Sequence, residues 1–223
     1  GILVRTEASG MRELLAFGWR YLPNGMATVV ITLTDRLLLA NMADVESASL
    51  FAVASLFPMV LLIAIQGYVF GWQPWCFARL ARREKGNSVE LAMGAGLFYI
   101  GLPLGGLIMA WGANWLGPYV IDPQFHGAFA YVLPLAMAMV LQGFCYFTQS
   151  VLQFYQRLAA LSWIALATMG MNLILNLYFI PDYGTLGSCW ATAAAYGFGF
   201  VLTAYMALRT LRKEYVIKEN PSV

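Results

Sequence analysis

The stretch TVVITLTDRLLLANMAD, from Thr28 to Asp44, places an acid beside a base within a run of apolar side chains. Asp35 and Arg36 interrupt a segment otherwise rich in valine, isoleucine and leucine. Insertion scales assign each such residue a cost of about 2.5–3.5 kcal/mol at the centre of a membrane helix. A partner or water must offset that cost, so the stretch indicates either a structural ion pair or a functional site.

The composition of the whole chain indicates which solvent surrounds it. Of 223 residues, 61% are hydrophobic and 11% are charged, whereas an average soluble domain is about 25% charged. Apolar stretches long enough to cross a bilayer as a helix, about 20 residues each, recur along the chain. We therefore predict an all-α, polytopic membrane protein. Its expected surroundings are the lipid bilayer, and no nucleic-acid partner is expected.

Turn-forming and charged segments divide the chain into six predicted spans. They cover residues 14–41, 47–72, 88–116, 128–153, 158–180 and 188–208. Residues 1–13 are predicted to be a cytoplasmic linker, 14–208 a six-helix transmembrane lobe, and 209–223 a cytoplasmic tail. The opening GILVRTEASG lacks an initiator methionine and resembles an inter-domain linker. We therefore expect the chain to be part, or a processed product, of a longer protein.

Basic residues alternate between the predicted loops. Eleven of the thirteen precede the first span or follow the second, fourth and sixth: Arg5, Arg12, Arg79, Arg82, Arg83, Lys85, Arg157, Arg209, Arg212, Lys213 and Lys218. The intervening loops carry only acidic charges, at Asp44, Glu46, Asp122 and Asp182. By the positive-inside rule this pattern predicts that both termini are cytoplasmic.

The first predicted span carries a polar stripe. At 100° per residue, Arg20, Asn24, Thr28 and Asp35 fall within about 80° of one another. The stripe is interpreted as the lining of a water-filled cavity, with Arg20 reaching an anionic substrate and Asp35 holding a proton or a sodium ion. The alternative is structural: Arg20 snorkels to the headgroups, and Asp35 and Arg36 form ion pairs or anchors.

A second stripe of hydrogen-bonding side chains runs along the fourth predicted span. It consists of Gln142, Tyr146, Gln149, Gln153 and Gln156, again within about 80°. Lipid would leave these groups unsatisfied, so they indicate either a hydrated wall suited to sugars or hydrogen bonds between helices. Asn172 and Asn176, one turn apart on the fifth span, extend this wall or pack against it.

No sequence motif for chemistry is present. The chain has no HExxH, no P-loop and no dinucleotide fingerprint. One histidine and three isolated cysteines predict no metal site and no disulfide framework. We expect no cofactor beyond a possible coupling proton or sodium ion, and we do not expect an enzyme.

Three segments resemble a known family. Residues 14–54 resemble the opening of the C-terminal half of the polysaccharide-transporter, or O-antigen flippase, family in their Gly18, Pro23, Asp35 and Arg36. GWQPWCFARL, residues 71–80, is similar to the family's Trp-x-Pro-like segment. MNLILNLYFIPDYGTLGSCWATAAAY, residues 171–196, resembles its pattern Asn-Leu-x-x-x-Pro-x-x-Gly-x-x-Gly-Ala-x-x-Ala-Thr. The matches are Asn176, Leu177, Pro181, Gly184, Gly187, Ala191 and Thr192, and Ser188 replaces the first alanine.

The resemblance implies a fold and a function. The family belongs to a superfamily that also includes multidrug and toxin extruders and peptidoglycan-precursor flippases. Its members build two lobes of six helices around a central cavity and work by alternating access. The chain would be the second lobe and would need either the missing N-terminal lobe of the same transporter or a separate partner lobe. The flippases carry undecaprenyl-pyrophosphate-linked oligosaccharide across the bacterial inner membrane, from the cytoplasmic to the periplasmic leaflet. Arg20 lies where the family often has an apolar residue, so its role depends on the residue argument above.

The candidate site residues take two roles in this interpretation. Asp35 and Arg36 would couple an ion or gate the pathway. Substrate would be bound by Arg20, which would reach the phosphate, and by Asn24, Gln142, Tyr146, Gln149, Gln153, Asn172 and Asn176. Three alternatives stay open: a multidrug or small-molecule cation antiporter of the same superfamily, a membrane enzyme of polysaccharide assembly, and a purely structural membrane subunit.

Overall fold

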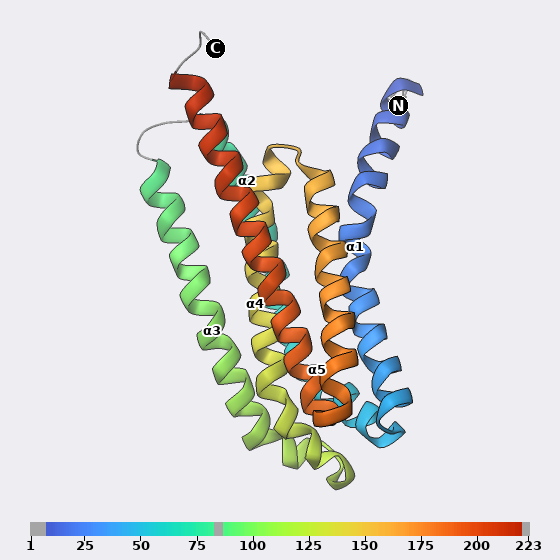
Figure 1. The fold of residues 1–223 in the computed structure, drawn as a ribbon. Helices are drawn as coiled ribbons and strands as arrows, with labels where there is room; N and C mark the ends of the chain where they lie inside the picture. Colours follow the sequence, from blue (N-terminus) through green and yellow to red (C-terminus); the bar gives the residue numbers. More distant parts are fainter. Residues whose placement is uncertain (1–7, 83–86, 220–223) are drawn as a thin grey trace, which may run out of the picture.

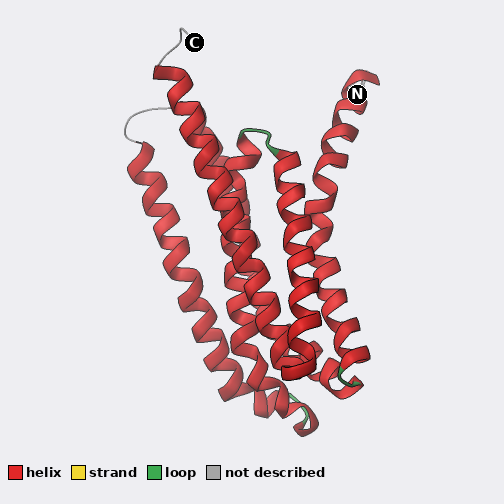
Figure 2. Cartoon of the chain, viewed as in Figure 1, coloured by secondary structure: helices red, strands yellow, loops and turns green. Residues whose placement is uncertain are grey.

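The computed structural model describes residues 8–82 and 87–219, and the regular elements in these ranges are all helical (Figure 2). In chain order they are α1 (Ala8–Met42), α2 (Val45–Arg82), α3 (Asn87–Val120), the short 3₁₀ helix η1 (Pro123–Ala128), α4 (Phe129–Phe154) and α5 (Leu158–Glu219). The all-α prediction is confirmed. Residues 1–7 of the predicted linker and 220–223 of the predicted tail lie outside the described ranges, while 8–13 and 209–219 continue α1 and α5 as helix. These two segments contain no proline that would end a helix.

Helix α5 reverses its direction at a glycine. Gly184 has φ 53° and ψ −133°, so the helix is interrupted there. Figure 1 shows the two limbs, residues 158–183 and 185–219, running in opposite directions. At Gly187 a side chain has no room, because a Cβ would lie 2.8 Å from the carbonyl carbon of Phe179 and overlap its oxygen. One glycine thus supplies the positive φ of the turn, and the other permits the close approach of the limbs.

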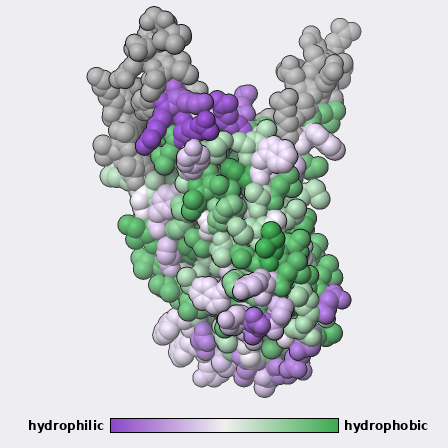
Figure 3. All heavy atoms as spheres, in the orientation of Figure 1, coloured by the Kyte–Doolittle hydropathy of each residue, from purple (hydrophilic) through white to green (hydrophobic). Residues whose placement is uncertain are grey.

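The outer surface suits a bilayer. Four helical segments in the described part of the chain are long and apolar enough to cross a membrane: Val45–Ala81, Met93–Val120, Pro123–Phe154 and Leu158–Lys213. Figure 3 shows an apolar middle with polar residues gathered toward the two ends. The predicted count of six separate spans is not confirmed, because the fifth and sixth belong to α5 and α1 is not among the four.

Helix α4 lies at the centre of the bundle. It packs against α5, α2 and α3, while α1 packs mainly against α5 and also against α2. The largest apolar core joins α2, α3 and α4, where the rings of Phe98 and Phe147 stack with centroids 4.8 Å apart. The described ends of α1 and α5 lie at the same end of the molecule (Figure 1). This arrangement leaves α1 covering the polar faces of α4 and α5.

Candidate functional site

Asp35 lies buried where α1 meets both limbs of α5. Its side chain is 1% exposed. Oδ1 accepts a hydrogen bond from Asn176 Nδ2 at 2.8 Å, and Oδ2 accepts one from Thr192 Oγ1, also at 2.8 Å. Asn172 Nδ2 donates to Thr192 Oγ1 at 3.2 Å. The polar cluster formed by Asp35, Asn172, Asn176 and Thr192 is called the Asp35 cluster below.

The reversal of α5 explains why these residues meet. Asn176 precedes Gly184 by eight residues (184 − 176), and Thr192 follows it by eight (192 − 184). Once the two limbs run side by side in opposite directions, positions equally far from the turn lie at the same depth. Asn172 lies one helical turn before Asn176 and therefore shares its face. The turn at Gly184 thus determines which α5 side chains α1 contacts.

The cluster holds more acceptors than donors. Asn172 Oδ1 and Asn176 Oδ1 are buried acceptors without a hydrogen-bond partner, and the Ser188 hydroxyl one turn before Thr192, which can donate or accept, also lacks one. Thr192 has one hydroxyl proton, yet its oxygen lies within bonding distance of both Asp35 Oδ2 and the Ser188 carbonyl, at 2.8 and 2.9 Å. A carboxylate beside unpaired amide oxygens can be satisfied by a proton or by a cation that prefers oxygen ligands. No group of three or more His, Cys, Asp or Glu side chains suited to a metal occurs in residues 8–82 and 87–219.

Arg36 does not pair with its neighbour Asp35. Its Nη2 donates to Ser55 Oγ of α2 at 3.1 Å, and its Nε is buried without a partner. Ser55 in turn donates to the carbonyl oxygen of Ala52 at 2.7 Å. The predicted alternative of an ion pair between Arg36 and an acid on a neighbouring helix is not found among the described residues, since its partner on α2 is a serine. Helical geometry keeps Arg36 away from Asp35, because adjacent residues point about 100° apart.

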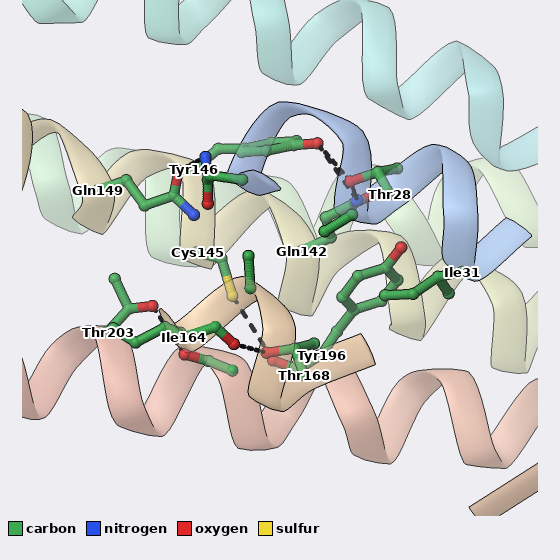
Figure 4. Close-up of a pocket in the computed structure, with 14 residues that line it drawn as sticks. Thr28, Ile31, Gln142, Cys145, Tyr146, Gln149, Ile164, Thr168, Tyr196 and Thr203 are labelled. Carbon is green, nitrogen blue, oxygen red and sulfur yellow. Dashed lines mark hydrogen bonds between the residues drawn. The ribbon is translucent and has the colours of Figure 1, made fainter. Parts of the chain in front are cut away.

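The two predicted polar stripes face each other across α1 and α4. Asn24 Nδ2 donates to Gln149 Oε1 at 3.3 Å. Thr28 Oγ1 lies 3.0 Å from the hydroxyl of Tyr146 and accepts a bond from Gln142 Nε2 at 2.8 Å (Figure 4). Asn24 and Thr28 of the first stripe are thus bonded to the second stripe, while Asp35 bonds to α5 instead. We call the contact between the two stripes the α1–α4 seam.

A small cavity with a mixed polar and apolar lining lies behind the seam, between α1, α4 and α5 (Figure 4). Its volume of about 40 Å³ has room for about three or four water molecules, each needing about 10–15 Å³. Thr28, Gln142 and Tyr196 are among the residues that line it. Gln142 Oε1 is buried without a partner. Most of the exposed lining is nevertheless apolar, so polar groups form only part of the cavity wall.

A larger pocket opens between α1, α2 and α4, with a volume of about 700 Å³. Its polar lining consists of Tyr21, Asn24, Gln66, Gln73, Tyr146, Gln149, Gln153 and Gln156. Gln153 Nε2 donates to the hydroxyl of Tyr21 at 3.0 Å, and its Oε1 accepts from Gln73 Nε2 at 2.9 Å. The size lies within the range of about 300–1,000 Å³ typical of ligand sites. We call this the amide pocket.

The predicted substrate-binding residues whose side chains are described fall into two groups, one around the amide pocket and the adjacent small cavity and one in the Asp35 cluster. Asn24, Tyr146, Gln149 and Gln153 line the amide pocket, and Gln142 lines the small cavity next to it. Asn172 and Asn176 do not extend this wall, because they bond within the Asp35 cluster. The side chain of Arg20 lies outside the described part of the structure.

Residue patterns within single helices missed four partners: Tyr21, Ser55, Gln73 and Thr192. A signal existed for two of them. Thr192 belongs to the same sequence pattern as Asn176, and Gln73 follows Gln66 by seven residues, which places both on one helix face.

Comparison with known proteins gives a likeness of fold. Protein-family profiles and curated protein sequences gave no match. A crystal structure of the MATE transporter VcmN from Vibrio cholerae, in the bent form, is similar to the chain with a TM-score of 0.70 at 18% sequence identity. The similarity covers 89% of this chain and 46% of that one. The chain thus has the fold of part of that protein and spans less than half of its length.

Proposed function

We propose that the chain is one lobe of a cation-coupled membrane transporter that moves a lipid-linked oligosaccharide by alternating access. The observation that carries the proposal is the position of α1. This one helix holds Asp35 in an acceptor-rich cluster and also supplies Tyr21 and Asn24 to the amide pocket. A proton or sodium ion arriving at Asp35 changes the charge that α1 presents to α5. Any resulting shift of α1 is transmitted to the pocket.

The chemistry of the amide pocket supports a substrate rich in hydroxyl groups. Its described lining includes five glutamines, one asparagine and two tyrosines, and no Asp, Glu, Lys or Arg. Each amide offers both donors and acceptors, which match the hydroxyls of a sugar. A cationic drug would gain little from a pocket without a carboxylate. Arg20, one turn before Asn24 on α1, is our candidate for the pyrophosphate.

The remaining parts of the proposal concern what surrounds the chain. A single lobe leaves the amide pocket without an opposite wall, so we place a second lobe there, with this chain as the C-terminal half. The basic loops support an orientation with both termini in the cytoplasm, and we propose a bacterial inner membrane as the location. Likeness to the fold of a transporter supports a carrier over an enzyme of polysaccharide assembly or a structural subunit.

A second candidate is export of a small molecule by cation antiport. The observation that favours it is the fold, because the similar solved structure is that of a MATE transporter. Both candidates use the Asp35 cluster in the same way. They differ in what occupies the amide pocket.

The test is a flipping assay in vesicles that contain the native full-length protein and a fluorescent lipid-linked oligosaccharide. Gln153→Leu removes two hydrogen bonds to the pocket wall. Gln124→Leu, at an exposed position in η1, is the matched control. We expect the Gln153 variant to flip the oligosaccharide at least about tenfold more slowly, since a site built to bond a hydroxyl discriminates strongly. The control should equal wild type.

Equal rates for both variants, or no flipping by wild type, would reject the oligosaccharide as substrate. Cation-driven export of a fluorescent dye by the same vesicles would then support the second candidate.

A further inference from the structure

A separate pocket lies between α2 and α3 and shares no residue with the sites above. Its volume is about 760 Å³. Gly67 and Gly71 lie on its α2 side, and a Cβ added at either would meet nothing within 4 Å. The pocket is an open groove on the surface, and the two exposed glycines add no side chain to its α2 side.

Aromatic rings form a fixed wall of this pocket. The hydroxyl of Tyr68 donates to the Gly94 carbonyl oxygen of α3 at 2.9 Å. The Trp72 ring packs so closely on Gly94 that a Cβ there would overlap it. The centroids of Trp72 and Trp75 are 4.9 Å apart, and Trp72 also lies 4.8 Å from Phe147 of α4. Contacts with α3 and α4 thus fix the orientation of Tyr68 and Trp72 on α2.

An ion pair forms one end of the pocket. Arg79 of α2 pairs with Glu90 of α3, and the Arg79 guanidinium carbon lies 4.5 Å from the centroid of the Trp75 ring. The side chains of Arg79 and Glu90 remain 29% and 46% exposed. A ligand can therefore reach a positive and a negative group side by side. Both lie near the end of the bundle where α2 ends and α3 begins.

The length of the pocket matches one leaflet of a membrane. From Gly67 to Arg79 the helix advances by twelve residues, or roughly 18 Å at 1.5 Å per residue. Half of a hydrocarbon core is about 15 Å. A molecule lying along the aromatic wall with its polar end at Arg79 would thus span one leaflet.

We propose that this pocket binds a phosphatidylethanolamine, a phospholipid whose headgroup carries a phosphate and a primary ammonium. The phosphate lies at Arg79, since a guanidinium fork suits phosphate oxygens. The ammonium lies at Glu90, and one acyl chain follows the wall from Trp75 to Gly67. A headgroup with both charges complements both members of the ion pair. Phosphatidylglycerol, which carries only the negative charge, would set that charge near Glu90.

The experiment is native mass spectrometry of the full-length protein in detergent, titrated with phosphatidylethanolamine or phosphatidylglycerol of identical acyl chains. Gly71→Leu fills the pocket. Gly101→Leu on α3 is the matched control, because a Cβ at that exposed position also meets nothing within 4 Å and the pocket does not include it. Glu90→Gln keeps the shape of the rim and removes its negative charge.

We expect wild type to retain phosphatidylethanolamine about fivefold better than phosphatidylglycerol, the factor that about 1 kcal/mol provides. Gly71→Leu should lower phosphatidylethanolamine retention about fivefold, and Gly101→Leu should leave it unchanged. Glu90→Gln should remove the preference between the two lipids. Equal retention of both lipids by wild type, stronger retention of phosphatidylglycerol, or equal behaviour of the two leucine variants would each overturn the proposal.

Discussion

Replacing Thr192 with valine removes the hydroxyl that donates to Asp35 Oδ2 at 2.8 Å, and it keeps the shape of the side chain. A hydrogen bond to a charged group contributes about 1.5–3 kcal/mol in soluble proteins. Bonds between membrane helices average about 0.6 kcal/mol and reach about 1.7. The substitution also leaves Asn172 Nδ2 without its acceptor, the Thr192 hydroxyl oxygen. We therefore expect the free energy of unfolding to fall by about 1.5–2 kcal/mol.

The matched control is Thr210→Val on the same helix. Thr192 and Thr210 are both 6% exposed, but the Thr210 hydroxyl donates to the Met206 carbonyl of its own helix, at 2.8 Å. A bond within one turn of a helix adds little to tertiary stability. Its loss should change the free energy of unfolding by less than about 0.5 kcal/mol.

The assay is thermal unfolding in detergent, followed by a thiol-reactive dye. All three cysteines are buried in the folded protein, so they label on unfolding. At about 2–4 °C per kcal/mol for a chain of this size, Thr192→Val should lower Tm by about 3–8 °C. Thr210→Val should lower it by less than about 2 °C. Equal shifts for the two variants would refute the contact between Thr192 and Asp35.

Three further outcomes follow from the packing. Gly187→Ala should prevent the close approach to Phe179 and lower Tm by more than about 6 °C in the dye assay, whereas Gly170→Ala, with open space at its Cβ, should not. Thr28→Val breaks two contacts of the α1–α4 seam and should cost about 1 kcal/mol, which appears as a Tm lower by about 2–4 °C. The three thiols, Cys76, Cys145 and Cys189, are buried and should react with a maleimide only after the protein opens. Fewer than about one in ten should be labelled within minutes in the native protein, and all of them in denaturant. Rapid labelling of the native protein would contradict the fold.

Much of the architecture could be predicted from composition and periodicity. Apolar runs predict helices in a bilayer, and wheel positions predict that Thr28 and Tyr146 lie on polar faces, which the structure brings together. Such patterns repeat every turn within one helix, so they are visible in a single sequence. They identify the face of a helix but not the helix that it contacts.

The Asp35 cluster shows where this reasoning ends. The sequence predicts that Asn176 extends the glutamine wall or packs against it, yet Asn176 contacts a residue 141 positions away. That contact depends on the turn at Gly184, whose backbone angles have no periodic signature. The turn itself lies between the fifth and sixth predicted spans, which form the two limbs of α5. Long-range partners require the three-dimensional path of the chain, which local patterns do not specify.

The proposed cation-coupled transport depends most on Asp35 as the residue at which the cation acts. The direct measurement is oligosaccharide flipping by the full-length protein in vesicles, with and without an imposed proton or sodium gradient, for wild type and Asp35→Asn. The gradient should accelerate wild type, while the variant, which keeps the side-chain shape and lacks the negative charge, should flip at the same slow rate in both conditions. An Asp35→Asn protein that responds to the gradient as wild type does would contradict the account.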